Sequence, residues 1–165
     1  MNSRSWSDQI DLLIRARTPL IWIRSQEESR VQALLSQTAQ RLQRRLACWD
    51  FIDGLSGVLN ADGLGRRQPM AVLEWLQALP QTSPTLLLVK DFHRFCDDPG
   101  IARMLRNLST HLRSTPHTLV LCTGGWNPPA DLEEAITLLV LPLPVAEDLR
   151  QLLTSIASGS GAPLD

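Results

Sequence analysis

Hydrophobic residues along this chain alternate between compact apolar runs and stripes at helical spacing. The compact runs predict five β-strands: PLIWIRS at 19–25, ACWDFID at 47–53, TLLLVKDF at 85–92, HTLVLCTGG at 117–125 and ITLLVLPLP at 136–144. The central runs are apolar throughout, which is expected of parallel strands that helices cover on both faces.

Segments with apolar residues three or four positions apart lie between these runs and predict helices. These helices are expected to begin near residues 5, 25, 70, 98 and 146. Ser25 and Glu28 form the S-x-x-E pattern of a capping box at the start of the second helix. Asp98 and Pro99 place an acid at the cap and proline at the first helical position of the fourth helix.

The regular alternation of strands and helices predicts an α/β fold: a three-layer α/β/α domain with a five-stranded, mostly parallel sheet. We expect residues 1–157 to form this single domain, and the glycine-rich segment 54–69 to be a long loop within it. The segment SGSGAPLD at 158–165 has the composition of a flexible tail or linker. Ligands of such sheets bind beyond the carboxyl ends of the strands, so the residues after each strand are the candidates for a site.

Composition narrows the class of protein. Hydrophobic residues make up 44% and charged residues 20% of 165 residues, as in a soluble globular domain large enough to bury its own core. A formal net charge of −1 argues against broad affinity for nucleic acid or an anionic membrane. The arginines that could still form a local basic patch are Arg41, Arg44, Arg45, Arg66 and Arg67.

The cysteines and the apolar runs indicate the cellular compartment in which the protein is expected. Three widely spaced cysteines do not suggest a disulfide framework and are typical of a reducing environment. The N-terminus lacks the pattern of a secretory signal, and no run approaches the roughly 18 apolar residues that a membrane helix needs. We therefore expect a cytoplasmic protein that does not act at a membrane.

The first strand end lacks a phosphate-binding loop. In nucleotide-binding α/β proteins, G-x-x-x-x-G-K-[ST] follows this strand, because its backbone N–H groups and its lysine hold phosphates. Here the strand is followed by SQEESR at 25–30, with no glycine, no lysine and two carboxylates that repel phosphate. The phosphate cradle is therefore expected to be absent, with Ser25 as a vestigial position.

The third strand ends in Lys90-Asp91-Phe92-His93. Asp91 stands where ATPases of this architecture hold magnesium, but Phe92 replaces the second carboxylate that polarises water. The structural alternative is that Asp91 caps the strand end or pairs with Lys90, His93 or Arg94. A set of metal ligands at Asp91, His93, Cys96 and Asp97 lacks a matching second pair, so we expect no metal.

The fourth strand runs into Thr123 and a Gly-Gly-Trp-Asn-Pro-Pro turn. Thr123 stands where a sensor of the γ-phosphate could be, although glycine-rich turns most often serve only to leave a sheet. Trp126 could contact a partner or be buried in the core. The vestigial nucleotide-binding positions are thus Ser25, Asp91 and Thr123, and the expected interaction surface comprises Lys90, His93, Arg94 and Trp126. We assign no catalytic residue.

Three segments carry a resemblance to a known family: PLIWIRSQEESRVQALL, LLLVKDFHRFCDDPGIARMLRNLS and PADLEEAITLLVLPLPVAEDLRQLL. Together they resemble the N-terminal region of the AAA-type ATPases of cyanobacteria and plastid genomes, the Ycf-type AAA family, over Ile10 to Leu153. The resemblance implies a degenerate AAA-like domain with the P-loop NTPase sheet order 5-1-4-3-2 and no helical lid. It also implies a C-terminal AAA domain in the parent protein, with the intact phosphate loop.

The resemblance implies a function that is not catalytic in this chain. It suggests a regulatory or assembly domain, with ATP and magnesium bound only by the rest of the parent ATPase and no cofactor here. The implied partners are the parent's own C-terminal AAA domain, another subunit or a protein client. The implied setting is photosynthesis or inorganic-carbon physiology in the cyanobacterial cytosol or plastid stroma.

Two alternatives stay open. One is a weak nucleotide-binding domain that uses Asp91 and Thr123 without a standard phosphate loop. The other is a clamp-loader-like, non-hydrolysing subunit that acts with DNA machinery, which a basic surface around Arg41 to Arg45 and Arg66-Arg67 would favour. Because the total charge is close to neutral, we do not expect nucleic acid to be a partner.

Overall fold

The computed structural model describes residues 3–141 and Arg150, with side chains from Trp6 onward. The helix expected near 146–156, apart from Arg150, and the tail expected at 158–165 lie outside the described residues. The helices and strands are α1 (Ser3–Arg15), β1 (Leu20–Arg24), α2 (Glu28–Arg41), β2 (Arg45–Asp50), β3 (Gly54–Ser56), α3 (Pro69–Gln77), β4 (Thr85–Lys90), α4 (Pro99–His111), β5 (Thr118–Thr123) and β6 (Thr137–Val140). Short 3₁₀ helices are η1 (Phe92–Phe95), η2 (Leu112–Ser114) and η3 (Ala130–Ala135).

The strands form one sheet of order β3-β2-β4-β5-β1-β6. All neighbours are parallel except the antiparallel pair β2–β3. The five predicted strands and their order are confirmed, since β6-β1-β5-β4-β2 is the expected 5-1-4-3-2 arrangement.

The sixth strand, β3, corrects the expectation of a loop throughout 54–69. Leu55 is almost fully buried in the core and pairs with Trp49 of β2, so burial of this one side chain holds a short strand there. Gly54 takes φ of 74°, and a Cβ at this position would lie 2.7 Å from the carbonyl oxygen of Gly63. Glycine is thus required where the chain returns close to itself.

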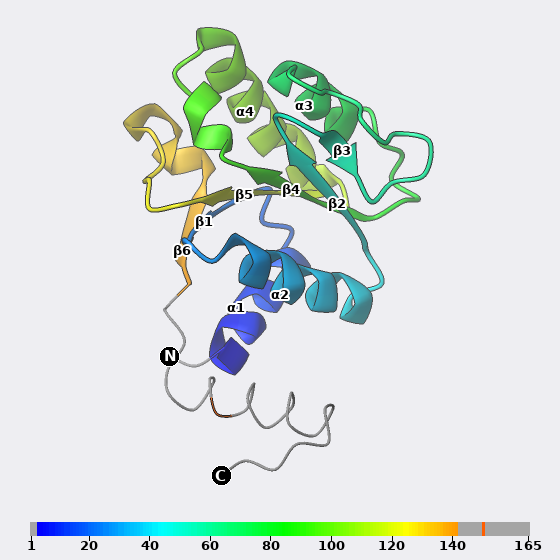
Figure 1. Ribbon diagram of the computed structural model, residues 1–165, viewed down its shortest axis with the longest axis vertical. Helices are drawn as coiled ribbons and strands as arrows, with labels where there is room; N and C mark the ends of the chain where they lie inside the picture. Colours follow the sequence, from blue (N-terminus) through cyan, green and yellow to red (C-terminus); the bar gives the residue numbers. More distant parts are fainter. Residues whose placement is uncertain (1–2, 142–149, 151–165) are drawn as a thin grey trace.

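Helices cover both faces of the sheet, as Figure 1 shows: α1 and α2 lie on one face, and α3 and α4 lie on the other. Each face has its own apolar core. Trp6, Ile10 and Ile14 of α1 pack against one face, while Leu105 and Leu108 of α4 pack against the other. The continuous burial of β4 and β5 follows from this double cover.

Two predicted helix caps have different outcomes. Asp98 caps α4 as expected, with its Oδ1 accepting a hydrogen bond of 2.9 Å from the Ile101 N–H. The capping box at Ser25 and Glu28 is wrong, because α2 begins at Glu28. The Ser25 N–H donates to the Thr123 carbonyl at 2.9 Å, which holds Ser25 beside the sheet, and its Oγ accepts from the Glu27 N–H.

Within the part of the chain that the structure describes, no helix is long and apolar enough to cross a membrane.

Candidate functional site

The connection between β1 and α2 is where a nucleotide-binding protein of this architecture would hold phosphate. Only three residues, Ser25, Gln26 and Glu27, separate the strand from the helix. Ser25 is buried and fixed to β5 through the Thr123 carbonyl. A connection this short, without a glycine, does not form the wide loop of N–H groups that surrounds phosphates.

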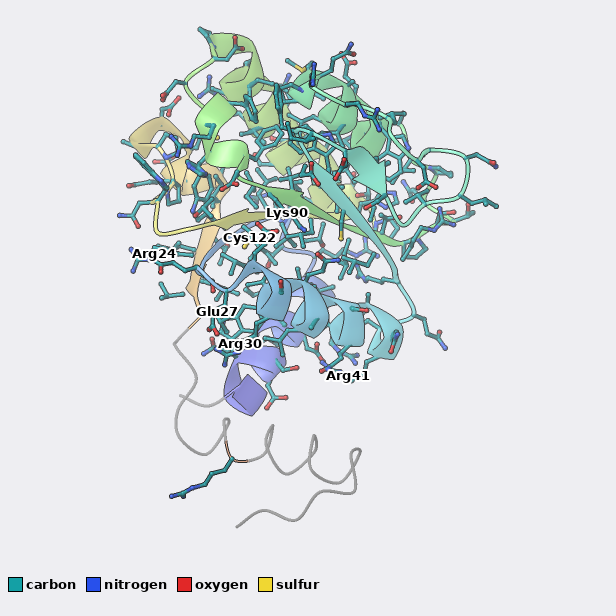
Figure 2. The ribbon with its side chains drawn as sticks, in the orientation of Figure 1. Arg24, Glu27, Arg30, Arg41, Lys90 and Cys122 are labelled. Carbon is teal, nitrogen blue, oxygen red and sulfur yellow. The ribbon has the colours of Figure 1, made fainter. Side chains whose placement is uncertain are left out.

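The carboxylates after β1 are held by cations of the same region. Glu27 accepts a hydrogen bond from Arg30 at 2.7 Å, and both residues are labelled in Figure 2. The Glu28 carboxylate lies 2.9 Å from Lys90 Nζ. Burial by itself would lower the pKa of Lys90, but the hydrogen bond and charge of Glu28, with the charges of Cys48 and Asp50, raise it above its ordinary value. Lys90, which we placed on the expected interaction surface, is therefore paired across the sheet end. No local pattern indicates this pair, because α2 and β4 meet only in the fold.

Asp91 begins a tight turn at the end of β4. It takes φ of 51°, the left-handed region, and its N–H donates to the Cys122 carbonyl. Its exposed side chain forms no cap hydrogen bond at η1. The next residue, Phe92, is fully buried and lies edge-on to Trp49, with ring centroids 5.5 Å apart. Phe92, which stands where a second carboxylate would be needed, is thus a core residue.

The end of β5 is tied to the turn that follows it. The Thr123 side chain is 1% exposed, and its hydroxyl donates to the Trp126 carbonyl at 3.1 Å. The same carbonyl accepts a hydrogen bond of 2.8 Å from Trp22 Nε1. Arg24 at the end of β1 donates to Asn127 Oδ1 at 2.7 Å. These bonds fix the turn above the strand ends.

His93, Arg94 and Trp126 form one surface feature, here called the Trp126 platform. The His93 ring stacks on the Trp126 ring with centroids 5.3 Å apart, and the Arg94 guanidinium lies 5.6 Å from the Trp126 ring centroid. Trp126 remains 57% exposed. A cavity of about 370 Å³ lies beside the platform, and Trp22 and Asp97 contribute to its walls. The structure thus brings together three of the four predicted interaction residues.

Burial shifts the pKa values of several titratable groups at this end of the sheet. Burial lowers the pKa of His93 below its ordinary value, and Asp91 opposes this effect, so the imidazole is neutral at pH 7. Burial raises the pKa of Cys96 and Cys122 to about 12, which makes both thiols poor nucleophiles. Among the described residues, no group of three or more His, Cys, Asp or Glu side chains is placed to hold a metal.

Two of the arginines considered as a basic patch are engaged within the domain. Arg41 binds the Asp11 carboxylate through two nitrogens, at 2.7 and 2.9 Å, and is labelled in Figure 2. Arg44 donates to the carbonyl oxygens of Pro116 and Ile14. Arg41 therefore joins α2 to α1, Arg44 joins the α2–β2 connection to α1 and to the segment before β5, and these two side chains do not form a free basic stripe.

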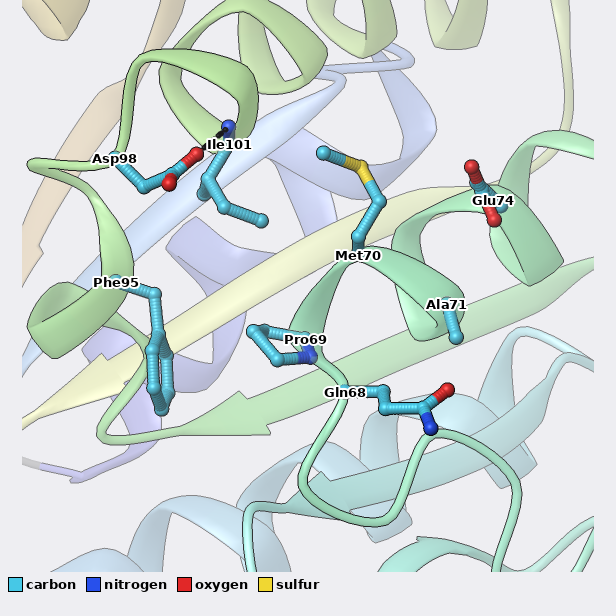
Figure 3. A pocket seen from close by; sticks show the side chains of 8 residues that line it. All are labelled: Gln68, Pro69, Met70, Ala71, Glu74, Phe95, Asp98 and Ile101. Atoms are coloured by element: carbon cyan, nitrogen blue, oxygen red, sulfur yellow. Dashed lines mark hydrogen bonds between the residues drawn. The ribbon is translucent and has the colours of Figure 1, made fainter.

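A second hollow lies between the starts of α3 and α4 and has a volume of about 460 Å³. Figure 3 shows Pro69, Met70 and Ile101 around it, with Phe95 at one side. None of these residues was predicted to belong to a site. The lining comes from three separate elements, so no local pattern in the sequence could indicate this hollow.

A sheet of this order, with its candidate site at the carboxyl ends of β1, β4 and β5, defines an α/β domain of the AAA-type, P-loop NTPase class. Solved structures share the fold: a RuvB mutant of Thermotoga maritima has a TM-score of 0.68 at 14% identity and aligns with 100% of this chain and 54% of its own. PCH-2 of C. elegans has a TM-score of 0.56 at 12% identity, over 98% of this chain and 49% of its own.

The chain belongs to the family of SpoVK-like AAA ATPase N-terminal domains, which matches residues 6–141. It is similar to the AAA domain-containing protein ycf46 of Trieres chinensis and of Guillardia theta, each 34% identical over 97% of this chain. The alignments cover 32% of those relatives, so the chain spans about a third of their length. The expected resemblance to the Ycf-type AAA family is confirmed.

Proposed function

We propose that this chain is a non-catalytic regulatory or assembly domain of an AAA-type ATPase. The observation that carries the proposal is the β1–α2 connection, where Glu27 and Glu28 occupy the place of a phosphate loop and are paired with Arg30 and Lys90. A phosphate entering here would meet two carboxylates and would have to displace both of their cations. ATP and magnesium would then be bound by the rest of the parent protein.

A weak nucleotide site at Asp91 and Thr123 is less well supported. The Thr123 hydroxyl donates a hydrogen bond to the Trp126 carbonyl, and Thr123 is buried. The hydroxyl is therefore not available to a γ-phosphate. Asp91 keeps an exposed carboxylate, but Phe92 beside it is a core residue. Magnesium at Asp91 would depend on nucleotide phosphates to complete its shell, and the short β1–α2 connection offers no loop to hold those phosphates.

The clamp-loader-like alternative is also less well supported. It would need a basic surface for nucleic acid, and the guanidinium groups of Arg41 and Arg44 are bound within the domain. Drosophila ORC bound to DNA shares the fold, with a TM-score of 0.51 at 16% identity, but this likeness concerns the fold alone.

The proposed mechanism is docking through the Trp126 platform. A half-exposed tryptophan beside a histidine and an arginine has the composition of an interface anchor. The partner we propose is the parent's own C-terminal AAA domain or another subunit, and a protein client is an alternative of the same kind. Regulation of photosynthesis in a cyanobacterium or plastid remains the setting that the resemblance suggests.

The first test is calorimetric titration of this chain with ATP and with ADP in the presence of magnesium, beside an Asp91→Ala variant. We expect no heat of binding at the β1, β4 and β5 ends, and therefore the same trace for both proteins. Binding by the native chain that Asp91→Ala abolishes would overturn the proposal, because Asp91 would then hold a nucleotide.

The second test concerns docking and uses the full-length protein. Trp126→Ala should weaken the association of subunits measured by sedimentation by about tenfold or more, as expected of an interface anchor. Leu59→Ala is the matched control, because Leu59 is 87% exposed and lies away from the platform in sequence. Equal association of native protein and Trp126→Ala would remove the platform from the interface between subunits.

A further inference from the structure

A second polar groove lies at the opposite edge of the sheet, at the amino ends of β1, β5 and β6. It has a volume of about 440 Å³ and is here called the basic groove. Its lining residues are Ala16, Arg17, Thr18, Pro19, Arg113 and Thr137. Arg17 to Pro19 lead into β1, Arg113 lies in η2 before β5, and Thr137 begins β6. The basic groove is therefore separate from the candidate site at the carboxyl ends.

The two guanidinium groups of the basic groove have no acidic partner among the described residues. Other arginines of the domain pair with carboxylates at 2.7 to 2.8 Å: Arg30 with Glu27, Arg41 with Asp11 and Arg106 with Asp131. Arg17 and Arg113 are exposed, and neither side chain forms an ion pair or hydrogen bond within residues 6–141. The lining itself contains no carboxylate. Within residues 6–141, both positive charges thus remain available to a ligand.

A third arginine adds to the positive potential behind the groove. Arg44 donates to the carbonyl oxygens of Ile14 and Pro116, which belong to the segments beside the groove. Burial lowers the pKa of Arg44, and the charge of Arg17 lowers it further. Arg17 and Arg44 are therefore close enough to repel one another, and no carboxylate contributes to the Arg44 shift. An anion in the groove would relieve this repulsion.

The backbone at Arg17 is costly for an arginine. α1 is followed by Arg17 at φ of 57°, where the Arg17 N–H donates to the Ile14 carbonyl and the Thr18 N–H donates to the Leu13 carbonyl. Glycine is the residue that usually takes this left-handed position after a helix. Arg17 is not needed to neutralise the negative C-terminal end of the α1 dipole, because Arg15 already places a cation in the last turn of α1.

We propose that the basic groove binds a phosphoryl group carried by a small molecule. A phosphate monoester offers three terminal oxygens, and the lining residues carry donors of the kind they accept from, two guanidinium groups and the hydroxyls of Thr18 and Thr137. A carboxylate group offers two oxygens in one plane, so a dicarboxylate such as malonate matches the charge of phosphate but cannot present three oxygens from one centre. The groove is larger than one phosphate group and has room for an attached organic part.

The test is titration of this chain with inorganic phosphate, with ribose 5-phosphate and with malonate, at constant ionic strength, by calorimetry and by thermal unfolding. We expect both phosphates to bind more tightly than malonate. The double variant Arg17→Gly with Arg113→Ala should weaken phosphate binding by about a hundredfold, roughly tenfold for each charge-assisted hydrogen bond that it removes. Arg17→Gly suits the left-handed backbone, so this variant should remain folded.

The control is a double variant with the same change of charge elsewhere, Arg66→Ala with Arg103→Ala, since both arginines are exposed. It should bind phosphate like the native chain. Tighter binding of ribose 5-phosphate supports an ester as the ligand, and tighter binding of inorganic phosphate supports the free ion. Equal weakening in both double variants, or equal binding of malonate and phosphate, would overturn the proposal.

The same variants distinguish phosphate binding in the basic groove from nucleotide binding at the strand ends. ATP also carries phosphates and could enter the basic groove. Heat that persists in Asp91→Ala and is lost in the Arg17 and Arg113 variant would belong to the basic groove, and would leave the non-catalytic role of the strand ends intact.

Discussion

Placing a carboxylate after Asp91 should strongly destabilise this domain and should not create an ATPase. The change is Phe92→Glu, which places a carboxylate where hydrolysing relatives of this architecture carry one. Phe92 is fully buried and lies edge-on to Trp49 and Phe95, with ring centroids 5.5 and 5.6 Å away. The glutamate side chain would therefore enter an aromatic cluster and not a cleft.

The magnitude follows from two contributions. Truncating a buried phenylalanine costs about 3 to 5 kcal/mol in the free energy of unfolding. A carboxyl group left in the same apolar site adds the cost of burying a polar group without a partner, about 1 to 3 kcal/mol. Phe92→Glu should thus lose at least about 4 kcal/mol, a large part of the roughly 5 to 15 kcal/mol that stabilises a domain. At about 2 to 4 °C per kcal/mol, Tm should fall by about 10 °C or more.

Urea unfolding followed by circular dichroism measures this loss, with Phe92→Leu as the control that keeps an apolar side chain and should lose less than about 2 kcal/mol. A loss below about 1 kcal/mol in Phe92→Glu would refute the reasoning, since it is smaller than the cost of truncating a buried phenylalanine. The side chain at this position would then be able to turn towards solvent, and the site after β4 would be open to an ATPase residue.

Three further predictions concern titration, backbone and thiols. The pKa of His93 is lowered in the fold, so its contribution to stability is present above about pH 6.5 and is lost as the pH falls below it. His93→Phe should therefore reduce the loss of stability between about pH 7 and 5 in urea unfolding, and His117, whose pKa is also lowered, should cause part of the loss that remains. Arg17→Gly should raise the free energy of unfolding by about 1 kcal/mol, because the left-handed region costs a non-glycine residue roughly 1 to 2 kcal/mol and glycine loses part of that gain in entropy; a decrease would show that the arginine stabilises α1. Cys96 and Cys122 should resist alkylation by iodoacetamide at about pH 8 until urea unfolds the chain, which mass spectrometry can follow for each thiol. Rapid labelling of either of these two thiols in the native protein would contradict their burial.

The candidate site shows where inference from sequence stops. The strand ends could be located from the apolar runs, because the carboxyl ends of parallel strands meet at one edge of a sheet. His93 and Trp126 were proposed for the same surface on that ground, and their rings stack. The partners of the charged groups could not be foreseen. Lys90 pairs with Glu28 of α2 and not with Asp91, because the side chain of Lys90 extends across the sheet end towards the helix.

The local sequence pattern was sufficient to predict a feature where all the residues that cause it lie in one segment. The fully apolar runs of β4 and β5 predict strands buried on both faces, and Asp98-Pro99 predicts the start of α4, because a cap and its helix are contiguous in the chain. The absence of a phosphate loop after β1 could likewise be read directly, since that motif needs its glycines and lysine in one stretch.

Tertiary structure decided whatever depends on elements that meet only after folding. Leu55 makes β3 a strand because it enters the core beside β2, whereas its glycine-rich surroundings predict only a loop. The hydrogen bond from Ser25 to Thr123 displaces the start of α2 and breaks the capping box. The basic groove, finally, joins Arg17 and Arg113 from distant segments, and no periodicity along the chain encodes such a meeting.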